Sequence, residues 1–69
     1  MSPSERDRAV DDLRVLTEAQ AADVLGISVW TLQRMRKRGE GPPITHISPR
    51  RIGYTVGNLR RHLQSRERA

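Results

Sequence analysis

The chain has 69 residues, of which 35% are hydrophobic and 3% aromatic, and it contains no cysteine. This length allows one small domain, and the lack of cysteine excludes disulfides, thiolate catalysis and cysteine-based zinc sites. No apolar run reaches the roughly 18 residues of a membrane span, and the polar N-terminus does not resemble a secretory signal. We therefore expect a cytoplasmic binding module that does not contact membranes.

The charge is unevenly distributed along the chain, whose net charge is +5. Residues 1–27 hold three basic and six acidic side chains, a net charge of −3, whereas residues 28–69 hold ten basic and two acidic side chains, a net charge of +8. Twelve of the thirteen basic residues are arginine, whose planar fork suits phosphate and guanine edges. The asymmetry indicates a polyanion-binding surface in the C-terminal part, with a merely soluble basic surface as the alternative.

Two short helices are predicted in the first third of the chain, one over residues 5–14 and one after Thr17. Thr17 can act as an N-cap, and Gln20 stands at the capping-box position. Gly26 can adopt the left-handed conformation that ends a helix. Apolar side chains recur with helical spacing in both segments: Ala9, Val10 and Leu13 in the first, and Ala21, Ala22, Val24 and Leu25 in the second.

Ser28 is a second N-cap and predicts a helix over residues 29–38, with Leu32 and Met35 pointing inward. The glycines and prolines between residues 39 and 43 end this helix.

After Pro43 the apolar spacing changes from helical to alternating, which predicts a β-hairpin with a turn at residues 48–50. Thr55 can cap a last helix, and the scattered glycines are interpreted as turns or caps. The predicted fold is mainly α with a small β-hairpin, in the order helix, helix, hairpin, helix. The strand-like apolar residues of the hairpin are Ile44, Ile47, Ile52 and Tyr54. The last helix has apolar residues spaced i, i+3 and i+7, namely Val56, Leu59 and Leu63.

Residues 18–37 resemble the twenty-residue helix-turn-helix signature. Ala22 occupies its fifth place, where a small side chain lets two helices cross closely, and Gly26 occupies its ninth place, in the turn. The buried places of the signature are matched by Ala21, Leu25, Ile27, Leu32 and Met35.

Residues 16–63 also resemble the winged helix-turn-helix family that includes MerR-type domains, AlpA-type prophage regulators and phage excisionases. The first half of the resemblance consists of Leu16-Thr17, Ala21-Ala22, Leu25-Gly26-Ile27-Ser28, Thr31-Leu32 and Arg34. The wing and last helix are matched by Gly41-Pro42-Pro43, Arg51-Ile52-Gly53-Tyr54, Leu59 and Leu63. The chain departs from the family at Met35 and His62, where tryptophan is common, and both changes cost core area.

The resemblance implies that the second helix of the motif enters the major groove of DNA and that the wing reaches an adjacent minor groove. Gln33 would pair with adenine, and Arg34 with guanine or phosphate. Hydroxyls at the start of the helix suit phosphate. The candidate DNA-binding residues are Ser28, Val29, Trp30, Thr31, Gln33, Arg34, Lys37, Arg50 and Arg51.

Each of these assignments has a structural alternative. Trp30 can instead pack on the hairpin as a core residue, and Gln33 can be a solvated helix residue. Arg36, Lys37 and Arg38 can simply complement the C-terminal end of their helix. Four arginines near the C-terminus are expected to form a solvated face or to attract phosphate diffusely, and not to recognise specific bases: Arg60, Arg61, Arg66 and Arg68. His46 is expected to be exposed on the hairpin, and His62 to be partly buried.

No catalytic, metal or cofactor site is predicted. His46 and His62 lack the i, i+4 spacing of a helical metal pair, most acidic residues lie before residue 24, and no glycine-rich phosphate loop is present.

The sequence is compatible with three functions. The first is an excisionase-type protein that binds repeated sites on double-stranded DNA, bends it and directs an integrase toward excision. The second is a small transcriptional regulator of the AlpA or MerR type, although the chain ends at Ala69 with no long dimerisation helix. The third is a protein-interaction adaptor, which an acidic second helix would have favoured. The chain is expected to divide into a polar segment over 1–14, the DNA-binding domain over 15–65 and a polar tail over 66–69. Copies of the chain are expected to associate head-to-tail on DNA.

Overall fold

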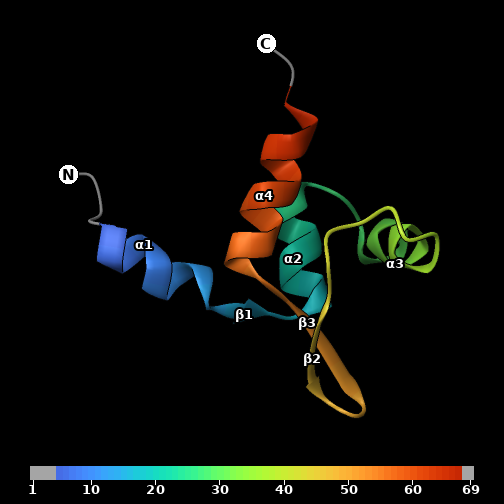
Figure 1. The fold of residues 1–69 in the computed structure, drawn as a ribbon. Helices are drawn as coiled ribbons and strands as arrows, with labels where there is room; N and C mark the ends of the chain where they lie inside the picture. Colours follow the sequence, from blue (N-terminus) through green and yellow to red (C-terminus); the bar gives the residue numbers. More distant parts are fainter. Residues whose placement is uncertain (1–4, 68–69) are drawn as a thin grey trace.

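The computed structural model describes residues 5–67, with side chains from residue 9 onward, and it has a winged helix-turn-helix fold (Figure 1). The expected fold class is therefore confirmed. Expectations for residues 1–4 and for Arg68 lie outside the described residues. The elements in chain order are α1 (Glu5–Asp12), β1 (Val15–Leu16), α2 (Glu18–Leu25), α3 (Val29–Lys37), β2 (Thr45–Ser48), β3 (Arg51–Thr55) and α4 (Val56–Arg66).

The helix-turn-helix pair, α2 and α3, begins and ends where its caps predict. The Gln20 N–H donates to Thr17 Oγ1 over 3.1 Å and the Thr17 N–H donates to Gln20 Oε1 over 3.0 Å, which is a complete capping box. Gly26 ends α2 with a φ of 73°, in the left-handed region that favours glycine. Ser28 caps α3. The chain therefore turns between α2 and α3 within three residues.

The sheet contains a strand that the sequence pattern did not predict. Val15 and Leu16 of β1 pair antiparallel with Thr55 and Tyr54 of β3, so the strand order is β1-β3-β2. The expected order of helix, helix, hairpin, helix is confirmed by α2, α3, the β2–β3 hairpin and α4, and β1 adds a third strand to the sheet. Two residues are too few to show an alternating pattern, and β1 owes its existence to pairing with the distant β3.

Gly53 lies in the middle of β3 and not in a turn, contrary to the expectation. A Cβ atom at this position would lie 2.7 Å from Val15 Cγ1 and 2.8 Å from Leu16 O. Glycine is therefore required where β1 and Ile47 pack over β3. The expectation for Gly57 is also wrong, because this residue lies in the first turn of α4 against Asp12.

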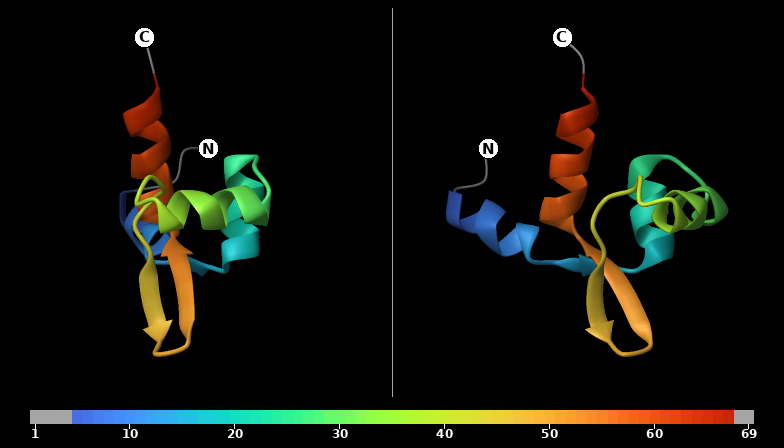
Figure 2. Two further views of the ribbon diagram at one scale, coloured as in Figure 1. Left: turned by 90° about the vertical axis from the view of Figure 1, so that its right-hand side faces the viewer. Right: turned by 45° about the vertical axis from the view of Figure 1, so that its right-hand side comes forward.

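The β2–β3 hairpin, which we call the wing, extends away from the helices (Figures 1 and 2). Thr45 pairs with Gly53 and His46 with Ile52, and the register shifts before Ser48 pairs with Arg51. Residues 49 and 50 form the predicted turn at the tip.

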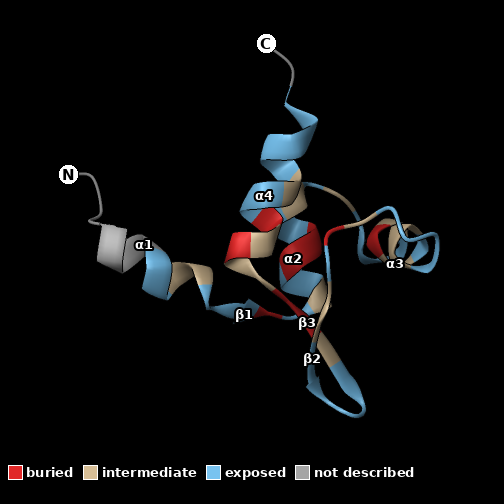
Figure 3. Cartoon of the chain, in the orientation of Figure 1, coloured by how far each residue is buried: buried red, intermediate tan, exposed pale blue. Residues whose placement is uncertain are grey.

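The core is small and lies where α2, α3, α4 and the sheet meet (Figure 3). Five large apolar side chains of the predicted pattern are exposed and not buried: Val10 is 66%, Leu13 77%, Val24 57%, Ile47 52% and Leu63 41% exposed. Val24 lies at the edge of the apolar face of α2, Ile47 lies on the wing, and Leu63 lies in the part of α4 that extends beyond the core. The buried hydrophobic residues are Leu16, Ala21, Ala22, Leu32, Tyr54 and Leu59.

A hollow of about 250 Å³ lies between α4 and the helix-turn-helix pair. Met35 and His62 both line it, beside Leu25 and Leu63. These are the two positions at which the chain departs from the tryptophan common in the resembling family. The smaller side chains leave Met35 and His62 only half-buried, so the inward placement expected for Met35 is met in part.

Candidate nucleic-acid interface

The outer face of α3 carries three of the nine candidate DNA-binding side chains. Leu32 is completely buried and defines the inner face of the helix. With 3.6 residues per turn, Trp30 and Arg34 lie about 160° and about 200° around the helix from Leu32, and Lys37 lies about 140° from it. All three side chains are exposed. They therefore form the part of α3 that extends farthest from the core.

Trp30 is 64% exposed, which contradicts the alternative that it packs on the hairpin as a core residue. The Arg34 guanidinium lies over its ring, 4.5 Å from the ring centroid. This distance is within the range of a cation–π interaction. The two side chains, one helical turn apart, form a single stacked unit on the surface of α3.

The first turn of α3 presents hydroxyl and amide groups. The Thr31 N–H donates to Ser28 Oγ over 3.0 Å, and the Ser28 hydroxyl donates to Thr31 Oγ1 over 2.9 Å. The only proton of the Ser28 hydroxyl is thereby used within the chain, while the Thr31 hydroxyl proton is left to donate elsewhere. Val29 is exposed at the same end of the helix. This end has the free donors and positive partial charge that suit a phosphate.

Gln33 lies on the flank of α3, about 100° around the helix from Leu32, and is half-buried. The structure thus brings Trp30, Arg34 and Lys37 together on the outermost face and sets Gln33 to one side of them.

Arg50 and Arg51 lie at the tip of the wing, and both are exposed. In the left-hand view of Figure 2, α3 lies across the molecule and the wing extends below it. The structure therefore presents two separate basic elements, a helix face and a hairpin tip, as the resemblance implied.

A partly buried polar cluster holds α3 against α2 and the sheet. Glu18 Oε2 accepts hydrogen bonds from Arg36 Nε and from the Tyr54 hydroxyl, each over 3.0 Å. Burial, followed by the hydrogen bond to the Glu18 carboxylate, raises the pKa of Tyr54 from 10.0 to about 12. These three residues, which we call the Glu18 cluster, join the first residue of α2 to the last turn of α3 and to β3.

Sequence reasoning missed the Glu18 cluster. One signal was available: Arg36 follows Leu32 by four residues, so it lies on the inner face of the helix, where an arginine needs a partner. Nothing in the sequence identified Glu18 and Tyr54 as that partner. The cluster corrects the expectation for Arg36, which does not merely complement the end of its helix.

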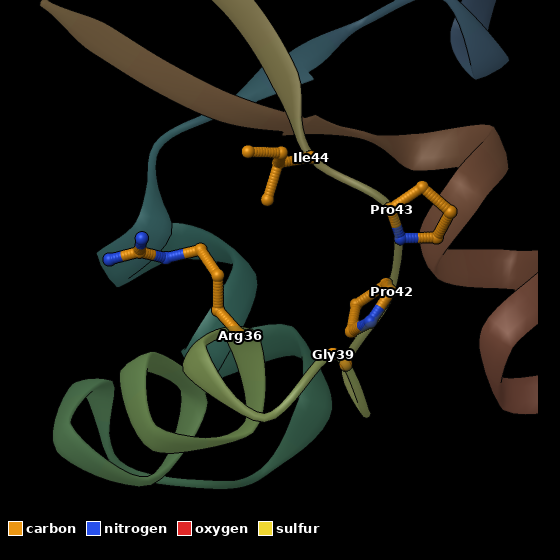
Figure 4. Close-up of a pocket in the computed structure, with 6 residues that line it drawn as sticks. Arg36, Gly39, Pro42, Pro43 and Ile44 are labelled. Atoms are coloured by element: carbon orange, nitrogen blue, oxygen red, sulfur yellow. The ribbon is translucent and has the colours of Figure 1, made fainter.

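The loop after α3 sets the distance between the helix and the wing. Gly39, Gly41, Pro42, Pro43 and Ile44 line a hollow of about 340 Å³ together with Arg36. Figure 4 shows the Arg36 side chain extending from α3 toward α2, and the two prolines within the loop, on the side away from the guanidinium. The glycines and prolines end the helix, as predicted, and lead the chain directly into β2.

The acidic α1 is paired with α4. Arg60 Nη2 lies 2.6 Å from Asp11 Oδ2, and Arg60 Nη1 lies 3.2 Å from Asp12 Oδ1. The Val56 N–H also donates to the carbonyl of Arg14 over 2.9 Å. Arg60 therefore has carboxylate partners within the chain, and it is exposed on a solvated face, as expected.

Among residues 5–67, no three His, Asp or Glu side chains gather as a metal site would require. Within the same part of the chain, every helix is too short or too polar to cross a membrane.

Comparison with protein families matches residues 15–67 to a family model described as a helix-turn-helix domain. The match begins at β1, includes α2, α3 and the wing, and ends just after α4. A comparison with curated proteins finds no match.

Proposed function

The chain belongs to the helix-turn-helix domain family, and we propose that it is a double-stranded DNA-binding protein of the excisionase type with no enzymatic activity of its own. The proposal rests on one observation: the structure has two exposed basic elements, the outer face of α3 and the wing tip. The α3 face presents Trp30, Arg34 and Lys37, and the wing tip presents two arginines. The outer face of α3 would lie in the major groove, and Arg50 and Arg51 would contact an adjacent minor groove.

The contacts divide by chemistry. Ser28, Val29 and Thr31 would lie against the phosphate backbone at the start of α3, where amides and the Thr31 hydroxyl face outward. Lys37 would contact phosphate as a point charge. Gln33 would pair with an adenine edge from its place on the flank of the helix.

One such module contacts little DNA. A single module of this kind buries on the order of 600–1,000 Å² and contacts few base pairs. Several copies arranged head-to-tail on direct repeats would provide the missing affinity, and an array of this kind would curve the duplex. Asp11 and Asp12 were the expected contacts to a neighbour's wing, but in the structure they pair with Arg60. A contact from them to Arg50 of a neighbouring copy would have to use carboxylates that already pair with Arg60.

We further propose that the protein acts on bacterial or phage DNA in the cytoplasm and that an integrase is its protein partner. A small transcriptional regulator remains the principal alternative, since the same fold serves both functions.

Titration of duplexes that carry one, two and three direct repeats tests the proposal. We expect a monomer without DNA, measured by sedimentation, and cooperative binding that increases with the number of repeats and bends the duplex. A stable dimer that binds one inverted repeat without bending would contradict the excisionase proposal in favour of a regulator. An Arg51→Ala variant is the matched control, because it should weaken binding to all three duplexes to a similar extent.

A further inference from the structure

Trp30 and Arg34 occupy the outermost part of α3, where the helix would approach the floor of a major groove. The indole is not part of the core, since its side chain lies opposite the buried Leu32. Indole carries a large apolar surface, and Trp30, which is 64% exposed, presents it to a partner. The exposed indole of Trp30 thus suits contact with an apolar group on the bound partner.

The stacking of Arg34 on Trp30 restricts the guanidinium. A cation–π contact, here 4.5 Å from the ring centroid, holds the guanidinium against the face of the indole. Its N–H groups point outward in the guanidinium plane and are free at its edge. Within the described part of the chain, Arg34 has no carboxylate partner, whereas Arg36 is paired with Glu18. Arg34 is therefore held in place for an acceptor outside the protein.

Two base edges match this pair of side chains. Guanine presents O6 and N7 in the major groove, and two parallel N–H groups of an arginine bind them together. Thymine presents a C5 methyl group in the same groove, which is the apolar surface an indole can cover. Because the guanidinium and the indole are in contact, the two bases must be neighbours.

We propose that Trp30 and Arg34 act as one unit that recognises a guanine next to a thymine. Arg34 binds O6 and N7 of the guanine, and the Trp30 indole packs on the methyl group of the thymine while it holds the guanidinium in place. This inference rests on the proposed function, because it requires α3 to lie in the major groove of double-stranded DNA.

The experiment uses duplexes enriched by the full chain from a random-sequence pool. Two substitutions in the DNA each remove one contact: 7-deazaguanine lacks N7, and uracil lacks the thymine methyl group. For the wild-type chain we expect 7-deazaguanine to weaken binding about fivefold or more. Uracil should weaken it about fourfold, as the loss of one buried methyl group predicts.

Variants of the protein separate the two contacts. Trp30→Ala should abolish the sensitivity to uracil and reduce the sensitivity to 7-deazaguanine, because the guanidinium loses its support. Arg34→Ala should lose the sensitivity to 7-deazaguanine, since it removes the donors to O6 and N7, and should keep the sensitivity to uracil. Arg38→Ala is the matched control: this exposed arginine lies one turn beyond Arg34 and should weaken all duplexes alike while both sensitivities persist.

Fluorescence provides a second measurement, because Trp30 is the only tryptophan of the chain. Its emission should change when the wild-type chain binds the enriched duplex, and change less when uracil replaces the neighbouring thymine.

Enriched duplexes without a guanine next to a thymine would overturn the inference and leave DNA binding intact. Equal sensitivity to uracil in the wild type and Trp30→Ala would do the same. Failure to enrich any duplex would overturn the proposed function, and the inference with it.

Discussion

Two arginines of α3, only two positions apart, have opposite environments. Arg36 lies toward the inner face of the helix, and its charge is neutralised by Glu18 within the chain. Arg34 lies on the outer face, stacked on an exposed tryptophan, and has no carboxylate partner among the described residues. Helical position thus decides whether the same residue type holds the fold together or remains available to a partner. The inner face should control folding, and the outer face should control binding.

Salt should produce the largest difference between the two faces. If the basic surface neutralises about five phosphates, the log–log slope of affinity against salt should be roughly −4 to −5. A fourfold rise in salt would then weaken binding by about 250- to 1,000-fold. The free energy of unfolding should change little over the same range, because the Glu18–Arg36 pair is partly buried. Gel-shift titrations with a flat salt response would contradict the DNA-binding function.

Removal of an inner-face side chain should have the next largest effect. Leu32→Ala should lower the free energy of unfolding by about 2–5 kcal/mol, since it leaves a cavity in a small core. Urea denaturation measures this change. Val24→Ala, at a largely exposed position of α2, is the control and should change stability by no more than about 0.5 kcal/mol. Similar losses in the two variants would show that Leu32 does not anchor α3.

Base contacts and backbone contacts should differ in their sequence dependence. Gln33→Ala should relax the preference at one or two base pairs and cost about 1–3 kcal/mol on the best site. Arg51→Ala should weaken binding to all sequences similarly, because the wing arginine contacts backbone or groove without base selection. Competition with random DNA distinguishes the two effects. The reverse pattern would mean that α3 is oriented differently on DNA.

Local signals explain how much of this fold could be predicted from the sequence. Caps at Thr17, Ser28 and Thr55 and the left-handed Gly26 are encoded within a few residues of where they act, so the helix boundaries followed from them. The outer face of α3 followed from helical spacing alone. The exposure of Trp30 could not be decided from the sequence, because it depends on where the hairpin packs.

Features that join distant segments could not be predicted. β1 pairs with a strand almost forty residues later, Arg60 of α4 pairs with Asp11 of α1, and Glu18 bonds Tyr54 across 36 positions. Nothing in the local pattern of any one partner identifies the other. Gly53 illustrates the same limit, since its need for glycine comes from the Val15 side chain that packs over it.

The Tyr54 hydroxyl provides a smaller test of the inner face. Tyr54→Phe removes a hydrogen bond to a carboxylate and should lower the free energy of unfolding by about 1–2 kcal/mol. The pKa of Tyr54 is raised from 10.0 to about 12 in the folded chain, so the unfolded chain ionises first as the pH rises. Wild-type stability should therefore fall between pH 10 and about 12. Denaturation curves of Tyr54→Phe should lack this fall, and an identical fall in both proteins would contradict the assignment.

The smallest effect should come from His62, which lines the hollow between α4 and the helix-turn-helix pair. Burial, and then the nearby positive charge of Arg66, lower the pKa of His62 from its ordinary value of 6.5. Above pH 6.5 the imidazole is neutral in both the folded and the unfolded chain, so its protonation does not change the free energy of unfolding. As the pH falls below 6.5, the unfolded chain binds the proton first, and the contribution of His62 to stability is lost through the folded-state pKa. Thermal unfolding across this range should show a decrease in Tm that His62→Gln reduces. His46→Gln, at an exposed histidine on the wing, should leave the wild-type decrease unchanged. The opposite result, in which His46→Gln and not His62→Gln reduces the decrease in Tm, would show that the hollow does not hold a desolvated imidazole. The histidine at this position would then not affect folding at acidic pH.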